Sequence, residues 1–211
     1  MDMKNKKASD ATVTRLSRYY RSLVHLETQG VAMVSSKALA RRDGISPAQV
    51  RKDLSCFGQF GTRGQGYPVA ELKEAISRIL GLYRTWNVAL VGVGYLGVSL
   101  LAYREFKAQG FHIVAAFDND PEKIGKKRRN VIIRDIRTLP EVVKKLDIEM
   151  AIVTVPQDAA QSVVDLLVRS GLKMILNFAP VSLRAPVGVV IRNVNIAIEL
   201  EALSYHLASG G

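Results

Sequence analysis

The stretch that decides the fold is Val88-Ala-Leu-Val-Gly-Val-Gly-Tyr-Leu-Gly97. Its apolar run has strand character and stops at Gly92, after which Gly94 and Gly97 complete the spacing Gly-x-Gly-x-x-Gly. In a strand–turn–helix unit the first of three such glycines permits a tight turn, the second lets the backbone approach a pyrophosphate, and the third lets helix and strand pack closely. Because a helix N-terminus favours anions, the stretch predicts a phosphate site.

A second apolar run ends in an acid at the distance that a dinucleotide site requires. Phe111–Phe117 finishes in Asp118, about 20 residues beyond the glycines, where a carboxylate can hold the hydroxyls of an adenosine ribose. The two features together predict a dinucleotide-binding site. The alternative is an α/β domain that has a glycine turn and binds no nucleotide.

The remainder of the C-terminal half alternates apolar strands with amphipathic helices. This alternation predicts a parallel sheet covered on both faces, and hence a Rossmann-like α/β domain. The helices expected are Val98–Gln109, a helix opened by a capping box from Thr138 to Glu141, and Ala159–Val168, with a basic loop at Lys126–Arg129. The further strands expected are Val131–Ile133, Met150–Val155, Met174–Phe178 and Val189–Val194.

The last helix expected, Ile196–Leu207, is apolar along one stripe and lies outside the sheet. Such a helix needs a partner surface. It either covers its own domain or packs against another subunit.

The composition is that of an ordinary globular protein, with 48% hydrophobic and 23% charged residues in 211. No apolar run is long enough for a membrane span and no secretory signal opens the chain, so no membrane association is expected. A single cysteine, Cys56, excludes an intrachain disulfide and a cysteine-based metal cluster, and no metal site is expected. This cysteine usage fits the reducing cytoplasm.

The net charge of +11 is concentrated in the N-terminal part. Residues 1–84 carry 15 Lys and Arg against 7 Asp and Glu, whereas residues 85–211 carry 15 against 12. A small basic module joined to a nearly balanced domain suggests a polyanion partner for the first part, although a basic surface also serves solubility. We therefore divide the chain into a basic N-terminal module with its linker helix (1–84), a nucleotide-binding domain (85–194) and a C-terminal helix (195–211).

Three helices are expected in the N-terminal module. The first is capped by Ser9 or Asp10 and stops at Gly30, the second is capped at Ser35-Ser36, and an Asp43-Gly44 turn follows. The apolar face expected for the first helix consists of Val13, Leu16, Tyr20, Leu23 and Val24, opposite Arg15, Arg18 and Arg21.

The third helix opens with Ser46-Pro-Ala-Gln49, a capping box with proline at the first helical position. Val50, Leu54 and Phe57 form its buried stripe, which leaves polar residues outside. The order of these elements is that of a helix-turn-helix. The residues expected to face DNA from this helix are Ser46, Gln49, Arg51, Lys52 and Ser55.

The segment Gly58–Gly66 contains four glycines, which suit an extended wing better than a core. Thr62 and Arg63 lie at its tip, where Arg63 can enter a minor groove of DNA. Arg51 and Lys52 would then contact base edges or phosphates in the major groove. A three-helix protein-binding domain is the alternative. Pro68–Leu82 is expected to be a linker helix.

A dinucleotide-binding fold does not by itself establish catalysis, because function has to be argued from the residues of the site. Those residues do not favour an enzyme. His25, His112 and His206 are scattered among predicted elements, and Tyr103 with Lys107 copies a dehydrogenase spacing on the wrong helix. What remains is a nucleotide fold without catalytic residues, joined to a DNA-binding module. The alternatives are an NAD-dependent dehydrogenase with an N-terminal oligomerisation module and a CoA-binding domain, against which Asp118 speaks through its ribose role.

Over essentially its whole length the chain resembles the Rex family of redox-sensing transcriptional repressors. The resemblance rests on many separate motifs in the same order. They are Arg15–Arg21, Val34–Lys37, Val50–Ser55, Phe57-Gly58, Gly61–Gly64, Gly66-Tyr67, Gly92–Gly97, Phe117-Asp118, Asp120–Gly125, Thr154–Pro156 and Asn177–Pro180.

The resemblance implies a winged-helix domain, a Rossmann domain and a C-terminal helix exchanged between subunits. It implies a homodimer that represses transcription by binding a pseudo-palindromic operator in double-stranded DNA and releases it when NADH binds, so that NADH and NAD⁺ are sensed and not consumed. Carried over to this sequence, the switch residues are Arg21, Tyr103 and Asn195. The dinucleotide-binding residues implied are Gly92, Val93, Gly94, Tyr95, Leu96, Gly97, Tyr103, Asp118, Thr154, Val155, Pro156, Asn177, Phe178, Ala179 and Pro180.

Three positions depart from the family pattern. Tyr95 stands where members often have Asn or Arg, and Cys56 stands where Tyr is common. Asn195 stands where an Asp usually pairs with the arginine that corresponds to Arg21 in the DNA-bound form. Asn accepts a hydrogen bond without the charge-assisted gain, so we expect a differently tuned switch.

Overall fold

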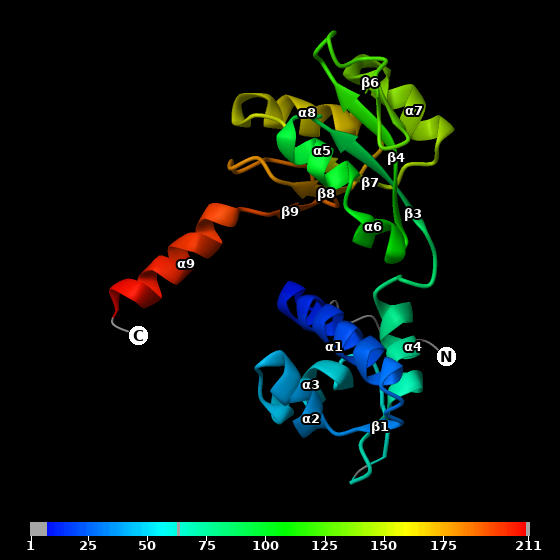
Figure 1. Ribbon diagram of the computed structural model, residues 1–211, viewed down its shortest axis with the longest axis vertical. Helices are drawn as coiled ribbons and strands as arrows, with labels where there is room; N and C mark the ends of the chain where they lie inside the picture. The colour runs from blue at the N-terminus through cyan, green and yellow to red at the C-terminus, as the bar shows by residue number, and fades with distance from the viewer. Residues whose placement is uncertain (1–7, 63, 210–211) are drawn as a thin grey trace. The chain divides into compact units, whose positions relative to one another are not determined.

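The computed structural model describes residues 8–62 and 64–209 (Figure 1). The chain divides into two compact units, Met1–Arg84 and Thr85–Gly211.

The N-terminal unit has the elements of a winged helix. Serine hydroxyls cap its first three helices. The side chains of Ser9, Ser35 and Ser46 each accept a hydrogen bond from the backbone N–H three residues later in the chain. Two short strands pair antiparallel, and one bridge, between Thr62 and Gly66, closes the glycine-rich segment. The elements are α1 (Asp10–Thr28), β1 (Met33–Val34), α2 (Ser36–Asp43), α3 (Pro47–Ser55), β2 (Tyr67–Pro68) and α4 (Val69–Ile79).

Two expectations for this unit are wrong. Val13 and Val24 of α1 are exposed, because the buried stripe follows a different helical phase and consists of Thr12, Leu16, Tyr19, Leu23 and Leu26. The helix expected as a linker is α4, which buries Leu72 and Ile76 in the core of the N-terminal unit. It packs against α1 and so belongs to the domain itself.

The second unit contains a seven-stranded sheet in the order β5-β6-β4-β3-β7-β8-β9. All neighbours are parallel except β5, which pairs antiparallel with β6. From β6 to β9 the order is that of doubly wound dinucleotide-binding domains. The strands are β3 (Trp86–Val91), β4 (Phe111–Asp118), β5 (Lys127–Arg128), β6 (Val131–Asp135), β7 (Met150–Val153), β8 (Met174–Asn177) and β9 (Val190–Asn193).

The basic loop expected at Lys126–Arg129 is instead part of a tight hairpin. Lys127 and Arg128 pair with β6, and Arg129 and Asn130 form the turn with φ of 49° and 77°. Positive φ at both turn residues is what a two-residue hairpin turn of the primed type requires.

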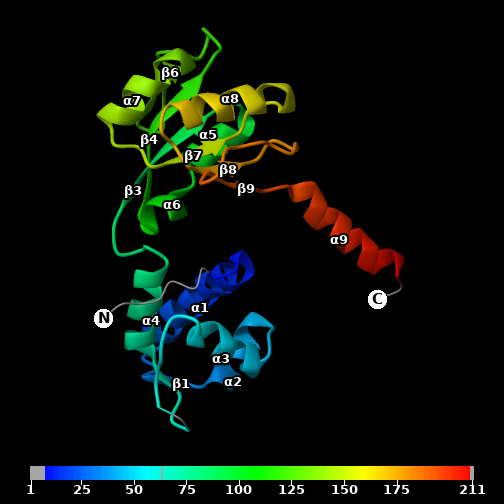
Figure 2. The same cartoon turned by 180° about the vertical axis from the view of Figure 1, so that it is seen from behind.

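Helices cover both faces of the sheet (Figure 2). One apolar cluster joins the sheet to α7 and α8, and a second, on the other face, includes residues of α5 and α6. The helical elements are α5 (Tyr95–Leu101), α6 (Arg104–Ala108), the 3₁₀ turn η1 (Ile136–Thr138), α7 (Leu139–Lys145), α8 (Gln157–Arg169) and α9 (Ile196–Ala208).

The single helix expected over Val98–Gln109 is wrong, because the chain breaks between α5 and α6. Tyr103 is extended, with φ −77° and ψ 101°. Leu100 and Phe106 both pack into the cluster on this face of the sheet. Six residues apart on an unbroken helix they would point in very different directions, so the break lets both reach the core.

The capping box expected at Thr138 is also wrong. The Thr138 hydroxyl donates to the Asp135 carbonyl over 2.8 Å, and the Asp135 carboxylate instead accepts from the backbone of Arg137. The intervening 3₁₀ turn moves the capping role to Asp135.

The helix α9 forms where expected, and all its side chains are exposed. The Asn195 side chain accepts from Ala197 N over 3.0 Å and caps it. Among the residues described, no helix is long and apolar enough to span a bilayer.

Candidate functional sites

The glycine turn is a close three-way contact between β3, α5 and β7. Gly92 has φ +94°, and a Cβ there would lie 2.8 Å from the Thr154 backbone. A Cβ on Gly97 would overlap the Gly92 carbonyl oxygen, to which the Thr154 hydroxyl donates over 2.7 Å. Nothing lies within 4 Å of a Cβ at Gly94. The first and third glycines are therefore required by packing, whereas the second faces open space that a ligand can approach.

Asp118 ends β4 beside this turn and is 7% exposed. Its carboxylate accepts from Val93 N over 2.7 Å, from Asp120 N over 3.0 Å and from Lys123 Nζ over 3.1 Å. Burial alone would raise the pKa of Asp118, but the two backbone N–H groups and the Lys123 ammonium outweigh it and lower the pKa. Asp118 is therefore ionised at neutral pH and can accept hydrogen bonds from ribose hydroxyls.

A groove of about 870 Å³ runs along the carboxyl ends of the strands beside these residues. Ligands of open α/β sheets bind in this place. Of the residues implied by the family resemblance, Gly92, Gly94, Asp118, Thr154, Val155 and Pro156 line it.

The groove also has walls that the sequence reasoning missed. Lys123 comes from the turn after β4, and Asp158, Ser162 and Arg169 come from one face of α8. Successive members of this α8 set are four and seven positions apart, a spacing that places them on one polar face of a helix and that could have been recognised in the sequence. That this face overhangs the glycine turn depends on the tertiary fold.

The other implied dinucleotide-binding residues, Tyr103 and Asn177 among them, lie outside this groove. Tyr103 is 53% exposed and its ring meets Phe106 edge-on at 4.9 Å. Asn177 is fully buried, and its amide binds the backbone of Ala179 and the side chain of Asn193. The other implied residues that do not line the groove are Val93, Tyr95, Leu96, Gly97, Phe178, Ala179 and Pro180, of which Tyr95 is 99% exposed. Their contact with a dinucleotide stays a prediction.

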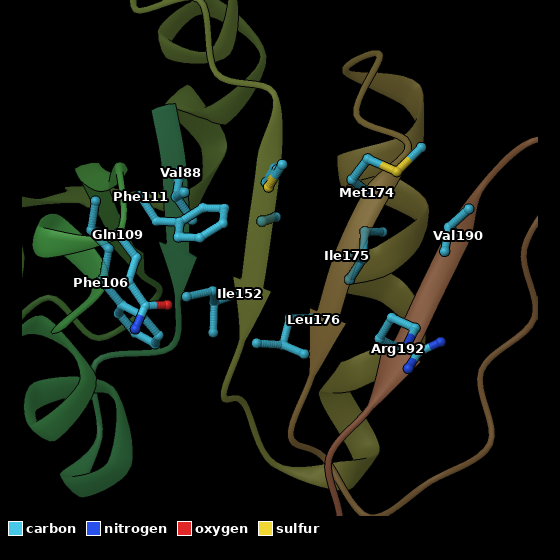
Figure 3. Close-up of a pocket in the computed structure, with 13 residues that line it drawn as sticks. Val88, Phe106, Gln109, Phe111, Ile152, Met174, Ile175, Leu176, Val190 and Arg192 are labelled. Carbon is cyan, nitrogen blue, oxygen red and sulfur yellow. The ribbon is translucent and has the colours of Figure 1, made fainter. Parts of the chain in front are cut away.

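An apolar groove of about 280 Å³ lies on the other face of the sheet, over β7, β8 and β9 (Figure 3). Phe106 and Phe111 stand at one side of it and Arg192 at the other. Crossovers of one hand place α8 on the opposite face of these strands, so α8 does not cover the groove. Its apolar lining was not expected from the sequence.

In the N-terminal unit, a groove of about 720 Å³ lies between α3 and the glycine-rich segment. It brings together Arg51, Ser55 and Thr62, and Arg51 Nη1 donates to Ser36 Oγ over 3.1 Å. Ser46, Gln49 and Lys52 lie on α3 or at its cap but do not line it, and Lys52 is exposed. Arg63 lies outside the described residues.

A buried ionic network fixes α3 to α1. Asp53, 1% exposed, accepts from Arg15 Nε over 2.6 Å, from Arg15 Nη2 over 2.8 Å, from Tyr19 over 2.8 Å and from Gln49 over 2.7 Å. Burial would raise the pKa of Asp53, but these hydrogen bonds lower it overall. Arg15, expected opposite the apolar face of α1, thus contacts the buried Asp53, and so does the Nε2 of Gln49. The contact of Gln49 with DNA stays a prediction.

Of the three switch residues, Arg21 lies in the N-terminal unit and is exposed, whereas Tyr103 and Asn195 lie in the second unit. Their joint action stays a prediction. Cys56 is exposed, and no group of His, Cys, Asp and Glu within the described ranges could hold a metal ion.

Two family models match the chain. One described as "CoA binding domain" covers residues 83–181, and one described as "Putative DNA-binding protein N-terminus" covers residues 7–55. Together they divide the chain into a nucleotide-binding part and a DNA-binding part.

Curated relatives match nearly the whole length. A redox-sensing transcriptional repressor Rex from Desulforamulus reducens is 48% identical over 98% of both chains. One from Carboxydothermus hydrogenoformans is 47% identical over 97% of this chain and 99% of the relative. The chain belongs to the Rex family.

Solved structures of a Rex-family repressor, RSP, have the same fold. RSP in complex with β-NAD⁺ and operator DNA is 38% identical and has a TM-score of 0.91 over 96% of this chain and 93% of RSP. RSP in complex with β-NADH is 36% identical, with a TM-score of 0.88 over 97% and 96%. The expected fold, an N-terminal DNA-binding domain followed in the sequence by a Rossmann-like domain, is confirmed.

Proposed function

We propose that this Rex-family chain is a transcriptional repressor that binds operator DNA and releases it when NADH occupies the groove beside Asp118. One observation carries the proposal: the open side of Gly94 and the ionised Asp118 face one groove, in a chain whose other unit is a winged helix. Relatives named redox-sensing transcriptional repressors support it.

Residues of the groove would hold the adenosine and pyrophosphate parts of a dinucleotide, and residues outside it would hold the nicotinamide. The glycine turn and the N-terminus of α5 would hold the pyrophosphate, and Asp118 the adenosine ribose. Tyr103 and the segment Asn177–Pro180 would lie at the nicotinamide. NAD⁺ carries a positive charge on this ring and NADH does not, so a site that excludes water there can separate the two by desolvation.

In the DNA-binding unit, α3 would enter the major groove. Arg51 and Lys52 would contact base edges or phosphates, and Ser46, Ser55, Thr62 and Arg63 would add contacts. Gln49 would act mainly through Asp53, because its amide is already engaged there.

The protein would act as a homodimer in the cytoplasm. A two-fold repressor places two recognition helices on half-sites about 34 Å or a multiple apart, which suits a pseudo-palindromic operator. The exposed side chains of α9 include Ile196, Leu200 and Leu203, which need a partner surface. A second copy of the chain would supply that surface.

The role is sensing and not catalysis. None of the three histidines lines the groove beside Asp118. Coupling would arise by population shift: two dimer arrangements differ in the spacing of their recognition helices, and NADH favours the one that does not fit the operator.

The test is a fluorescence-anisotropy titration of labelled operator DNA with the full chain. We expect operator affinity to fall by at least about fivefold on addition of saturating NADH, the lower range of allosteric couplings, and much less with NAD⁺. Identical responses to both nucleotides would exclude redox sensing. Turnover of NADH with a panel of small carbonyl compounds would favour the dehydrogenase instead.

Asn195→Asp is expected to tighten operator binding by the ligand-free protein about fivefold. The added charge would strengthen the proposed pair with Arg21 in the DNA-bound form by about 1 kcal/mol. An aspartate caps a helix as well as an asparagine does, so α9 should persist. Ser182→Asp adds the same charge at an exposed residue of the connection between β8 and β9 and serves as the control. Equal affinities of both variants and the wild type would show that the pair contributes little.

A further inference from the structure

The buried amide of Asn177 is the starting point. Its Nδ2 donates to the Ala179 carbonyl and its Oδ1 accepts from Ala179 N, both over 2.9 Å. These two bonds fold the segment after β8 back onto the end of the strand. The second Nδ2 hydrogen goes to Asn193 Oδ1, also over 2.9 Å. With both donors used, the Asn177 amide is locked in one orientation.

Asn193 stands between this segment and α9. It is the last residue of β9 and pairs with Asn177 in the sheet register, and Val194 N donates to the Asn177 carbonyl over 2.8 Å. Two residues later Asn195 caps α9. The segment Asn177–Pro180 and the start of α9 are therefore joined through one short stretch of backbone and the side-chain bond between Asn177 and Asn193.

We propose that Asn193 is a positioning residue that couples the segment Asn177–Pro180 to the orientation of α9. This inference rests on the proposed function, in which that segment lies at the nicotinamide and α9 contacts a second copy. A displacement of Ala179 by bound NADH shifts the Asn177 amide, and the bond to Asn193 passes this shift to the chain entering α9. Such a link is a local two-state contact whose equilibrium the ligand biases.

The position of Asn193 makes this role testable. Asn177 is fully buried, whereas Asn193 is exposed, so replacing Asn193 leaves the core intact. Alanine removes the acceptor of the Asn177 bond. Aspartate retains an acceptor oxygen at the same place and should keep the bond. Ser182→Ala, at an exposed residue of the connection between β8 and β9, is the matched control.

The experiment measures three quantities on the full chain: operator affinity without and with saturating NADH, the affinity for NADH, and the thermal unfolding midpoint. For Asn193→Ala we expect the ratio of the two operator affinities to fall about fivefold, the change expected for one lost neutral hydrogen bond. Asn193→Asp should restore the ratio, and Ser182→Ala should leave it unchanged. NADH affinity in the absence of DNA and the unfolding midpoint should stay near those of the wild type.

An unchanged ratio in Asn193→Ala would overturn the coupling role. So would a lowered ratio that Asn193→Asp fails to restore, or one explained by a parallel loss of NADH affinity and stability, since either would mark Asn193 as merely structural. If the wild type itself keeps its operator affinity when NADH is added, the proposed function fails, and the coupling role fails with it.

Discussion

Replacing Asp53 by alanine is expected to lower the free energy of unfolding by about 3 kcal/mol and to abolish tight operator binding. The change leaves the Arg15 guanidinium and the Tyr19 hydroxyl without their shared acceptor. Removing one partner of a buried ion pair costs about 3–5 kcal/mol, and the lower end applies because the Arg15 side chain is 22% exposed. Operator binding fails because α3 then loses the link that sets its angle against α1.

The measurement is urea unfolding followed by circular dichroism, with operator affinity measured by anisotropy. Asp53→Asn keeps the shape and one acceptor oxygen, so its losses should be intermediate. Glu74→Ala is the matched control, because it removes an exposed pair with Arg78 within α4. Such pairs contribute only about 0.3–0.5 kcal/mol. If Asp53→Ala is no less stable than Glu74→Ala, the network does not hold the unit together.

The same network gives the wild type a pH signature. The pKa of Asp53 is lowered in the folded state, so its contribution to stability is complete above the pKa of the unfolded chain, about 4, and is lost as the pH falls through the folded value. The difference in stability between the wild type and Asp53→Asn should therefore be constant from pH 5 to 7 and shrink below about pH 4. A difference that stays constant down to pH 3 would contradict this assignment.

Much of the fold was predictable because its signals are local. The capping serines, the strand before Gly92 and the acid that ends β4 are all read from neighbours within a few residues. The errors came from tertiary packing. The break at Tyr103 lets Leu100 and Phe106 both pack against the sheet. The hydrophobic periodicity of the segment does not predict this break.

The candidate sites show the same division. The sequence places Gly94 and Asp118 at the same edge of a parallel sheet, because carboxyl ends of neighbouring strands meet there. The bond between Arg15 and Asp53 joins residues 38 positions apart, and Arg169 reaches the groove from the end of α8. Such contacts depend on how helices are set against one another, which motif spacing does not contain.

Gly97→Ala and Gly94→Ala are expected to separate the two tasks of the glycine turn. A Cβ on Gly97 overlaps the Gly92 carbonyl oxygen and would lie 3.2 Å from Thr154 Oγ1, so the turn has to open. Overpacking of this kind costs about 1–3 kcal/mol, and the second unit should lose that much stability. A turn that has opened no longer presents its backbone to the pyrophosphate, so NADH affinity should drop by about 10- to 100-fold. The operator should then stay bound at NADH concentrations that release it from the wild type.

Gly94→Ala should behave differently, because its Cβ meets nothing within 4 Å and the backbone there has φ −82°. The thermal unfolding midpoint should equal that of the wild type or rise slightly, since alanine restricts the unfolded chain. NADH affinity should still fall by about tenfold or more, because the methyl group takes the space through which a pyrophosphate approaches the helix N-terminus. The measurements are NADH titration by fluorescence and thermal unfolding of each variant. If Gly94→Ala binds NADH as tightly as the wild type does, the pyrophosphate does not lie at this turn. The result for Gly97→Ala cannot change that conclusion, because only the Gly94 substitution alters the ligand site without disturbing the fold.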